Sequence, residues 1–365
     1  MGGEWTKCVC DVYIIRALSS LSLSLSLSCA LAHAPLSLSL SLSLSLTPPP
    51  PSPPLLHKTL RAQLVSELNE HKLEHTFEII DSTYASFDIC FLQETALVVK
   101  AQFEARPTTS ALFECYMPEL ACDRNQNSTI LLKRGWLTNV VEVTAELMAN
   151  ASENEIDVNC GDGDLFALRG YSPSTGEKYL LVSFHGDSNG LATPGVVAAV
   201  DALSSTEPFA QHRLIVGLDA NAWETEKKGV MGYETFMETL RASRLLCHLH
   251  TTPTLPGATA TDAASACSSS NPSLASAISS NIARTHLQPQ FHKAVFLANV
   301  RSDSTAKPCD YILHRAAQFD CGPALEGDTH RDNTGRGVFV PGQLCPTLAY
   351  PSDHCVVSAL LTLKP

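Results

Sequence analysis

The sequence predicts a fold that combines β-strands with α-helices. The apolar run of residues 214–216, closed by Gly217, is typical of a strand buried on both faces. A second apolar strand is predicted at residues 178–184. Residues 193–203, with proline in the first turn, are typical of a helix between the two strands. Strand, helix and strand in this order predict a crossover unit.

The amino-terminal residues 1–57 differ from the rest of the chain in composition. They contain two nearly perfect Leu-Ser repeats, residues 18–28 and 36–46, followed by a proline-rich run. We expect a disordered low-complexity leader here and a single catalytic domain over residues 58–365. Three origins of the leader stay open: a secretory signal, an organelle transit peptide, or a translated simple DNA repeat. An intracellular soluble protein is favoured, and targeting to an organelle or for secretion stays open.

Composition limits the classes of protein to consider. The 365 residues are 44% hydrophobic and 17% charged, which is enough for one large or two small globular domains. No uninterrupted run of about 20 apolar residues occurs, so no transmembrane segment is predicted. The 13 cysteines include no C-x-x-C pair, which favours reduced, buried thiols over a metal-thiolate site or a dense disulfide framework.

The body of the chain begins with two predicted amphipathic helices, residues 60–73 and 76–84, which have apolar side chains at helical spacing. Residues 87–94 form a short apolar run that ends in Gln93 and Glu94. Further strands are predicted at residues 128–133, 165–169, 309–314 and 355–363, and a further helix at residues 232–245. The Ser- and Ala-rich residues 258–280 are interpreted as a loop.

Five of the predicted strand ends carry polar residues that could take part in catalysis or bind a metal. They are Glu94, His185, Asp219 with Asn221, Asp310, and Asp353 with His354. Carboxylates gathered at one sheet edge repel each other unless a hard divalent cation lies among them. Ligation by carboxylate oxygens favours Mg²⁺, with Mn²⁺ as a second choice. Hydrolysis of a phosphoester would need a base for water, a donor to the phosphate and a metal, and this set provides the side chains.

The same residues, in this order, resemble a known family. The motifs are Leu92-Gln93-Glu94, Phe184-His185, Gly217-Leu218-Asp219-Ala220-Asn221, Asp310-Tyr311-Ile312 and Ser352-Asp353-His354. Together they are similar to those of the endonuclease/exonuclease/phosphatase superfamily, which is deoxyribonuclease I-like. The resemblance covers about residues 76–365. It implies an α+β fold, a four-layer sandwich of two mixed β-sheets flanked by helices.

The resemblance also implies a role for each motif residue. Glu94 would be the principal metal ligand and Asp353 a further acid near the metal. Asp219 would orient or deprotonate the attacking water, with Asn221 and His354 donating to the phosphate. Asp310 would pair with His354, and His185 would lie near the leaving group. The implied function is a magnesium-dependent phosphoester hydrolase, either a nuclease or a phosphatase.

One expected feature is missing from the sequence. The family's first strand usually ends in an asparagine, about 25 to 30 residues before the Gln-Glu motif. Here that distance falls in the predicted helix 60–73, where Asn69 is the only asparagine. A catalytically impaired member that acts as a binding or scaffold domain is therefore the alternative. The net charge of −12 opposes non-specific binding to DNA but does not identify the substrate. Nucleic acid, nucleotides, and phosphorylated small molecules or lipids all stay open as substrates. The oligomeric state also stays open.

Overall fold

The structure is a computed structural model of the 365-residue chain. It describes the backbone of residues 5–11 and, beyond these, residues 59, 63, 71–122, 126–224, 226–249, 308–325, 330–340, 347, 349–352 and 354–364. The predicted loop 258–280 and almost all of the predicted helix 60–73 lie outside the described residues.

Two mixed β-sheets form the centre of the molecule. The first has the order β11 (Phe319–Gly322), β13 (Val356–Leu363), β1 (Trp5–Asp11), β2 (Ile89–Thr95), β4 (Asn127–Lys133) and β3 (Phe113–Tyr116), with β12 (Arg331–Asp332) paired to β13. The second has the order β5 (Thr138–Glu142), β6 (Leu165–Tyr171), β7 (Lys178–His185), β8 (Arg213–Asp219), β10 (Asp310–Arg315) and β9 (Leu245–Cys247). Each sheet contains one described parallel pair, β1 with β2 and β7 with β8.

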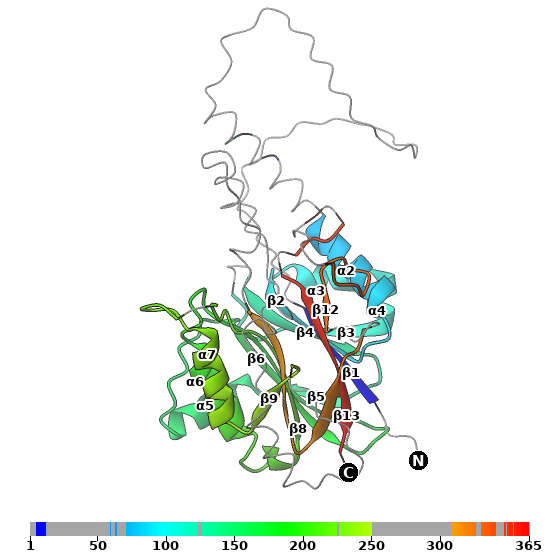
Figure 1. Cartoon of the computed structure of the whole chain (residues 1–365). Helices are drawn as coiled ribbons and strands as arrows, with labels where there is room; N and C mark the ends of the chain where they lie inside the picture. Colours follow the sequence, from blue (N-terminus) through cyan, green and yellow to red (C-terminus); the bar gives the residue numbers. More distant parts are fainter. Residues whose placement is uncertain are drawn as a thin grey trace, which may run out of the picture.

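Helices cover the outer face of each sheet (Figure 1). The first sheet is covered by α2 (Lys72–Thr83), α3 (Val99–Glu104) and α4 (Pro107–Leu112). The second is covered by α5 (Thr144–Glu153), α6 (Thr193–Leu203) and α7 (Tyr233–Ala242), and the short 3-10 helix η1 (Phe209–Gln211) precedes β8. The expected helix 76–84 is α2, which begins four residues earlier than predicted.

Three separate apolar cores lie between these layers. Strand β2 contributes to two of them, because its side chains alternate between the faces of the sheet. Cys90 and Leu92 pack with α2 residues such as Phe77, whereas Phe91 packs between the sheets against Ile215 of β8. The third core joins the second sheet to α5, α6 and α7. The fold is thus an α+β four-layer sandwich of two mixed sheets flanked by helices, as expected.

Strand β1 lies inside the segment that sequence analysis assigned to the leader. Residues Trp5–Asp11 pair with β13 on one side and with β2 on the other, so they form part of the first sheet (Figure 1). Asp11 is in register with Leu92, two residues before Glu94. The first strand, which sequence analysis sought in residues 60–73, is thus present, and it contains no asparagine.

The two sheets are joined tightly at Gly217. A Cβ atom built on Gly217 would overlap the ring of Phe91 on β2, so no larger residue fits at this crossing without a shift. The buried Gln93 spans the same gap, because its Nε2 lies 3.1 Å from Ser183 Oγ of β7 and 3.3 Å from Gly217 O. These contacts fix the height of β2 relative to β7 and β8, and with it the position of Glu94 relative to His185.

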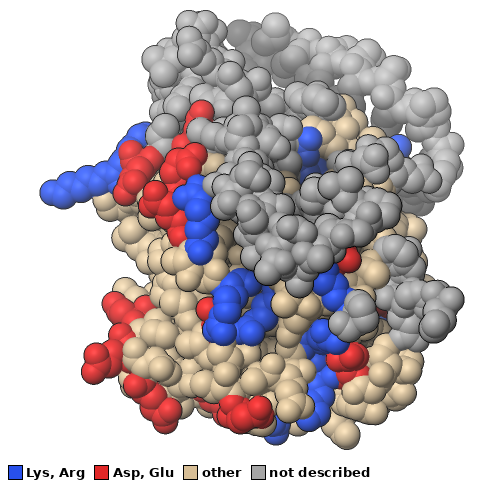
Figure 2. All heavy atoms as spheres, turned by 60° about the horizontal axis from the view of Figure 1, so that its bottom comes forward, with Lys and Arg blue, Asp and Glu red and all other residues tan. Residues whose placement is uncertain are grey.

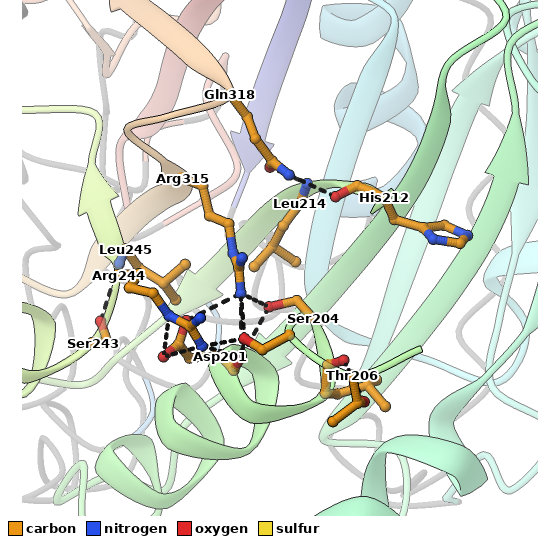
Figure 3. Close-up of polar contacts among 12 residues, drawn as sticks. Asp201, Ser204, Thr206, His212, Leu214, Ser243, Arg244, Leu245, Arg315 and Gln318 are labelled. Carbon is orange, nitrogen blue, oxygen red and sulfur yellow. Dashed lines mark hydrogen bonds and ion pairs between the residues drawn. The ribbon is translucent and has the colours of Figure 1, made fainter. Parts of the chain in front are cut away.

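A polar network holds the start of β8 and the end of β10, which lie at the ends of these strands away from Asp219 and Asp310 (Figure 3). Arg315, at the end of β10, donates from Nη2 to Ser204 Oγ at 2.7 Å and to the Asp201 carbonyl, near the end of α6, at 3.2 Å. Gln318 accepts from the Leu214 amide at 2.9 Å and donates to the His212 carbonyl at 2.7 Å. The start of β8 is therefore held in place, and its other end carries Asp219.

Candidate active site

Those of the predicted strand-end residues that the structure describes lie at one edge of the sandwich. Strands β7 and β8 are parallel and in register at their carboxyl ends, where His185 pairs with Asp219. Strand β10 is antiparallel to β8, so its first residue, Asp310, also pairs with Asp219. In the first sheet, β2 carries Glu94 near its carboxyl end, and His354 precedes β13, which starts at that same end.

Glu94 reaches the second sheet because β2 is irregular there. The register of β2 against β4 shifts between Leu92 and Thr95, and Glu94 has a φ of 53°, in the left-handed region that non-glycine residues seldom adopt. Such strain persists where the surroundings impose it, and it is frequent at functional sites. As a result, Glu94 Oε1 lies 3.0 Å from His185 Nε2.

Asp219 is held by the residue two positions later. The backbone amide of Asn221 donates to Asp219 Oδ1 at 2.8 Å, and its side-chain Nδ2 donates to Oδ2 at 3.0 Å. Nδ2 also donates to the carbonyl of Gly186 at 2.9 Å. The φ of 47° at Asn221 allows this local ring, because asparagine tolerates the left-handed region. Asp219 is therefore fixed in orientation, with both carboxylate oxygens accepting hydrogen bonds.

Asp310 and His354 form the pair that the resemblance implied. His354 Nδ1 lies 3.1 Å from Oδ1 and 3.2 Å from Oδ2 of Asp310, and both side chains are almost fully buried. The backbone of His354 is fixed as well: its amide donates to Ser352 Oγ at 3.0 Å, and its carbonyl accepts from Tyr350 Oη at 2.6 Å. Asp353, the predicted second metal ligand, lies outside the described residues.

The electrostatics of the edge favour a positive charge between Glu94 and Asp219. Burial alone would lower the pKa of His185, but the hydrogen bond and negative charge of Glu94, with Asp219 adding to them, raise that pKa to about 9. Burial alone would raise the pKa of Glu94, but the hydrogen bond and charge of His185 outweigh it and lower that pKa. His185 Nε2 is 3.9 Å from Asp219 Oδ2, so one imidazole faces two carboxylates.

The donor set fits a hard divalent cation. Asp219, Asp310 and His354 each offer a ligand atom within 4.8 Å of the others, and all three residues are buried. Three described carboxylates, those of Glu94, Asp219 and Asp310, lie against the imidazoles of His185 and His354. Several carboxylate oxygens with one imidazole are ligands that Mg²⁺ and Mn²⁺ accept.

One further charged residue near Glu94 was missed by sequence reasoning. Lys72 is buried at the start of α2, and its positive charge contributes to the lowered pKa of Glu94. In the sequence, Lys72 falls at the end of the predicted helix 60–73. No local pattern marks it, since its place beside Glu94 depends on how α2 packs on the first sheet.

Acidic and basic side chains are interspersed on the surface that Figure 2 shows. This agrees with a chain of net charge −12 in which no basic stripe is evident from the sequence. The eight cysteines whose side chains are described take no part in disulfide bonds. Within the described part of the chain, no helix has the length and apolar character needed to cross a membrane.

Comparisons with known proteins give matches at the level of structure only. No protein-family model and no curated protein matches the sequence. Among solved structures, truncated TDP2 from Caenorhabditis elegans is 14% identical, with a TM-score of 0.44, over 81% of this chain and 91% of that one. An endonuclease/exonuclease/phosphatase from Bacteroides vulgatus is 14% identical, with a TM-score of 0.45, over the same shares. The human Nocturnin catalytic domain with bound sulfate is 15% identical, with a TM-score of 0.39, over 76% of this chain and 81% of that one.

At these identities and TM-scores, the likeness adds no argument about activity. Proteins described as endonuclease/exonuclease/phosphatase family members are among the matched structures.

Proposed function

We propose that the chain is a divalent-metal-dependent hydrolase of phosphoester bonds. The observation that carries this proposal is the convergence of three carboxylates and two imidazoles from five strand ends on one edge of the sandwich, mostly buried and in mutual contact. A purely structural ion pair needs one partner for each charge. Here several titratable groups converge in one buried site and shift each other's pKa, and such clusters are typical of functional sites, so this arrangement favours a catalytic role.

Two sets of residues are candidates for the metal ligands. Glu94 with Asp353 is the set that the resemblance implies, and Asp219 with Asp310 and His354 is the set whose described geometry suits an ion. When bound, Mg²⁺ or Mn²⁺ supplies Lewis-acid polarisation of a phosphoryl oxygen and neutralises charge that develops on it.

The protein's own residues would divide the remaining work. Asp219 accepts the proton of the attacking water. Asn221 is foremost a positioning residue, because both hydrogens of its Nδ2 are already engaged, with Asp219 and with Gly186; donation to phosphate requires it to release one of them. His354, oriented by Asp310 through Nδ1, donates to the phosphate from its other ring nitrogen. His185 carries the positive charge nearest to Glu94 and would assist departure of the leaving group.

A generic ester tests this proposal without knowledge of the natural substrate. We expect the full-length chain to release p-nitrophenol from bis(p-nitrophenyl) phosphate in millimolar Mg²⁺ or Mn²⁺ and to stop when the metal is chelated. Asp219→Asn should lower kcat at least about a hundredfold, because general bases typically contribute that much. Asp320→Asn is the matched control, since Asp320 is half exposed on β11 at the far end of β13. Turnover that survives both chelation and Asp219→Asn would contradict the proposal.

A catalytically impaired binding domain is the second candidate. It is favoured by the composition of β1, which has no asparagine for the place where the family's first strand usually carries one. The same assay separates the two candidates: an impaired member would bind metal or a phosphate ester but would release no p-nitrophenol.

A further inference from the structure

We infer that a cavity beside the candidate active site binds a second anionic group of the substrate, so that the preferred substrates are phosphoesters with a further phosphate. This inference rests on the proposed function and narrows its substrate class. The cavity has a volume of about 420 Å³ and lies between the loop after β7 and the hairpin after β8. Its walls include Leu191, Pro194, Glu226, Lys227, Lys228 and Val230.

The cavity is built on the same loops that carry the candidate catalytic residues. The hairpin begins only a few residues after Asn221 and is tied to the His185 loop, since the Met231 amide donates to the Asn189 carbonyl at 2.8 Å. Trp223 Nε1 donates to the Ser188 carbonyl at 3.1 Å, and the Trp223 amide donates to the Met231 carbonyl at 2.9 Å. A ligand in the cavity would therefore lie at a fixed position relative to Asp219 and Asn221.

The charge of the cavity is positive, in contrast to the chain as a whole. Lys227 and Lys228 stand in a tight turn that is closed by the Val230 amide donating to the Lys227 carbonyl at 2.9 Å. Gly229 takes the position in this turn that requires a positive φ, here 76°. The one lining carboxylate, Glu226, accepts a hydrogen bond from Thr235 Oγ1 at 3.0 Å. The lining thus contains two exposed lysines and one carboxylate, which already accepts a hydrogen bond.

Two lysines held at a turn on a chain of net charge −12 are a local exception that suits an anion. The apolar walls suit the part of a substrate that links two phosphates. Leu191 is 57% exposed and, with Pro194 and Val230, offers apolar surface to a sugar or base. A cavity of this size lies within the range of small-molecule sites. A nucleoside bisphosphate, with one phosphate at the catalytic residues and the other at the lysines, matches both the charge and the apolar surface.

The test compares two ligands that differ only in the second phosphate. Binding of thymidine 3′,5′-bisphosphate and of thymidine 5′-monophosphate is measured by calorimetry in Mg²⁺ at low ionic strength. We expect the bisphosphate to bind at least about tenfold more tightly, since charge-assisted contacts of lysine with phosphate typically contribute this much. This preference should fall about tenfold in the double variant Lys227→Glu/Lys228→Glu. The control Lys133→Glu/Lys178→Glu changes two lysines at the strand ends that lie away from the candidate active site, at the end of β4 and the start of β7. This control should retain the preference for the bisphosphate.

Hydrolysis is measured in parallel on the p-nitrophenyl 5′-esters of the same two compounds. The ratio of their kcat/KM values should follow the binding preference, through KM. Equal binding of the two ligands by the wild type, or a preference that survives in Lys227→Glu/Lys228→Glu, would overturn the inference whether or not either ester is cleaved. A binding preference without p-nitrophenol release would uphold the cavity as an anion site and contradict the proposed hydrolase function.

Discussion

The contact between Glu94 and His185 makes the stability of the metal-free protein depend on pH. The pKa of His185 is raised from an ordinary 6.5 to about 9, so the folded state holds the proton more tightly than the unfolded state does. The resulting stabilisation is fully present below pH 6.5 and is lost as pH rises through about 9. The difference between the two pKa values corresponds to about 3 kcal/mol of unfolding free energy.

Urea unfolding in chelator, followed by circular dichroism from pH 6 to pH 9.5, measures this loss. Glu94→Gln removes the negative charge beside His185, so its stability should fall less over this range than that of the wild type, by about 2 to 3 kcal/mol. The pKa of Glu94 itself is lowered, so Glu94 stays ionised throughout and adds no slope. Cysteine thiols also titrate in the upper part of this pH range. Their effect on stability should be the same in the wild type and in Glu94→Gln, because the two proteins contain the same cysteines. Glu153→Gln, an exposed change on α5, is the control. Parallel curves for the wild type and Glu94→Gln would refute the reasoning.

Three further changes test the surroundings of the site. Gly217→Ala should lower the free energy of unfolding by about 1 to 3 kcal/mol in urea titrations, because its Cβ would lie 2.6 Å from Phe91 Cβ. The control Gly322→Ala, where a Cβ meets nothing within 4 Å, should change the free energy of unfolding little. Equal effects of the two changes would contradict the packing argument. Asp310→Asn should reduce kcat on bis(p-nitrophenyl) phosphate roughly tenfold or more without unfolding the protein, since it removes the charge that orients His354; an unchanged kcat would exclude that role. Arg315→Ala should lower the free energy of unfolding by about 2 to 4 kcal/mol, because its hydrogen bonds to Asp201, Ser204 and Ser205 are lost. It should leave kcat unaltered well below the melting temperature. A loss of kcat in a fully folded variant would show that this end of the second sheet is coupled to the end that carries Asp219 and Asp310.

Local sequence patterns predicted the strands that carry the site. Strands β7 and β8 are short, continuous apolar runs because both faces of the second sheet are buried, and such runs are recognisable without knowledge of their neighbours. Strand β5 was missed because most of its side chains are exposed or only partly buried, and β3 because it has only four residues. The helix α5, which covers the second sheet, was missed as well.

The pairing of distant segments could not be predicted from local patterns. Strand β1 is separated from β2 by the Leu-Ser repeats and the proline run, and its role in the first sheet depends on pairing with β13 near the other end of the chain. The contact between Glu94 and His185 likewise requires the irregular register of β2 and the crossing at Gly217. The sequence predicted the candidate site residues by type and order, whereas their mutual contacts depend on the packing of the two sheets.

Metal-induced thermal stabilisation tests most directly whether the gathered carboxylates form a metal-dependent catalytic site. Binding of Mg²⁺ or Mn²⁺ to the folded state alone at a hundred times its Kd adds about 2.7 kcal/mol, which should raise the Tm of the full chain by roughly 4 °C. Glu94→Gln keeps the shape and removes the charge, so we predict that it loses most of this rise and at least about a hundredfold in turnover. If Glu94→Gln retains both the metal-dependent rise in Tm and the turnover, the assignment of Glu94 to the metal site is wrong.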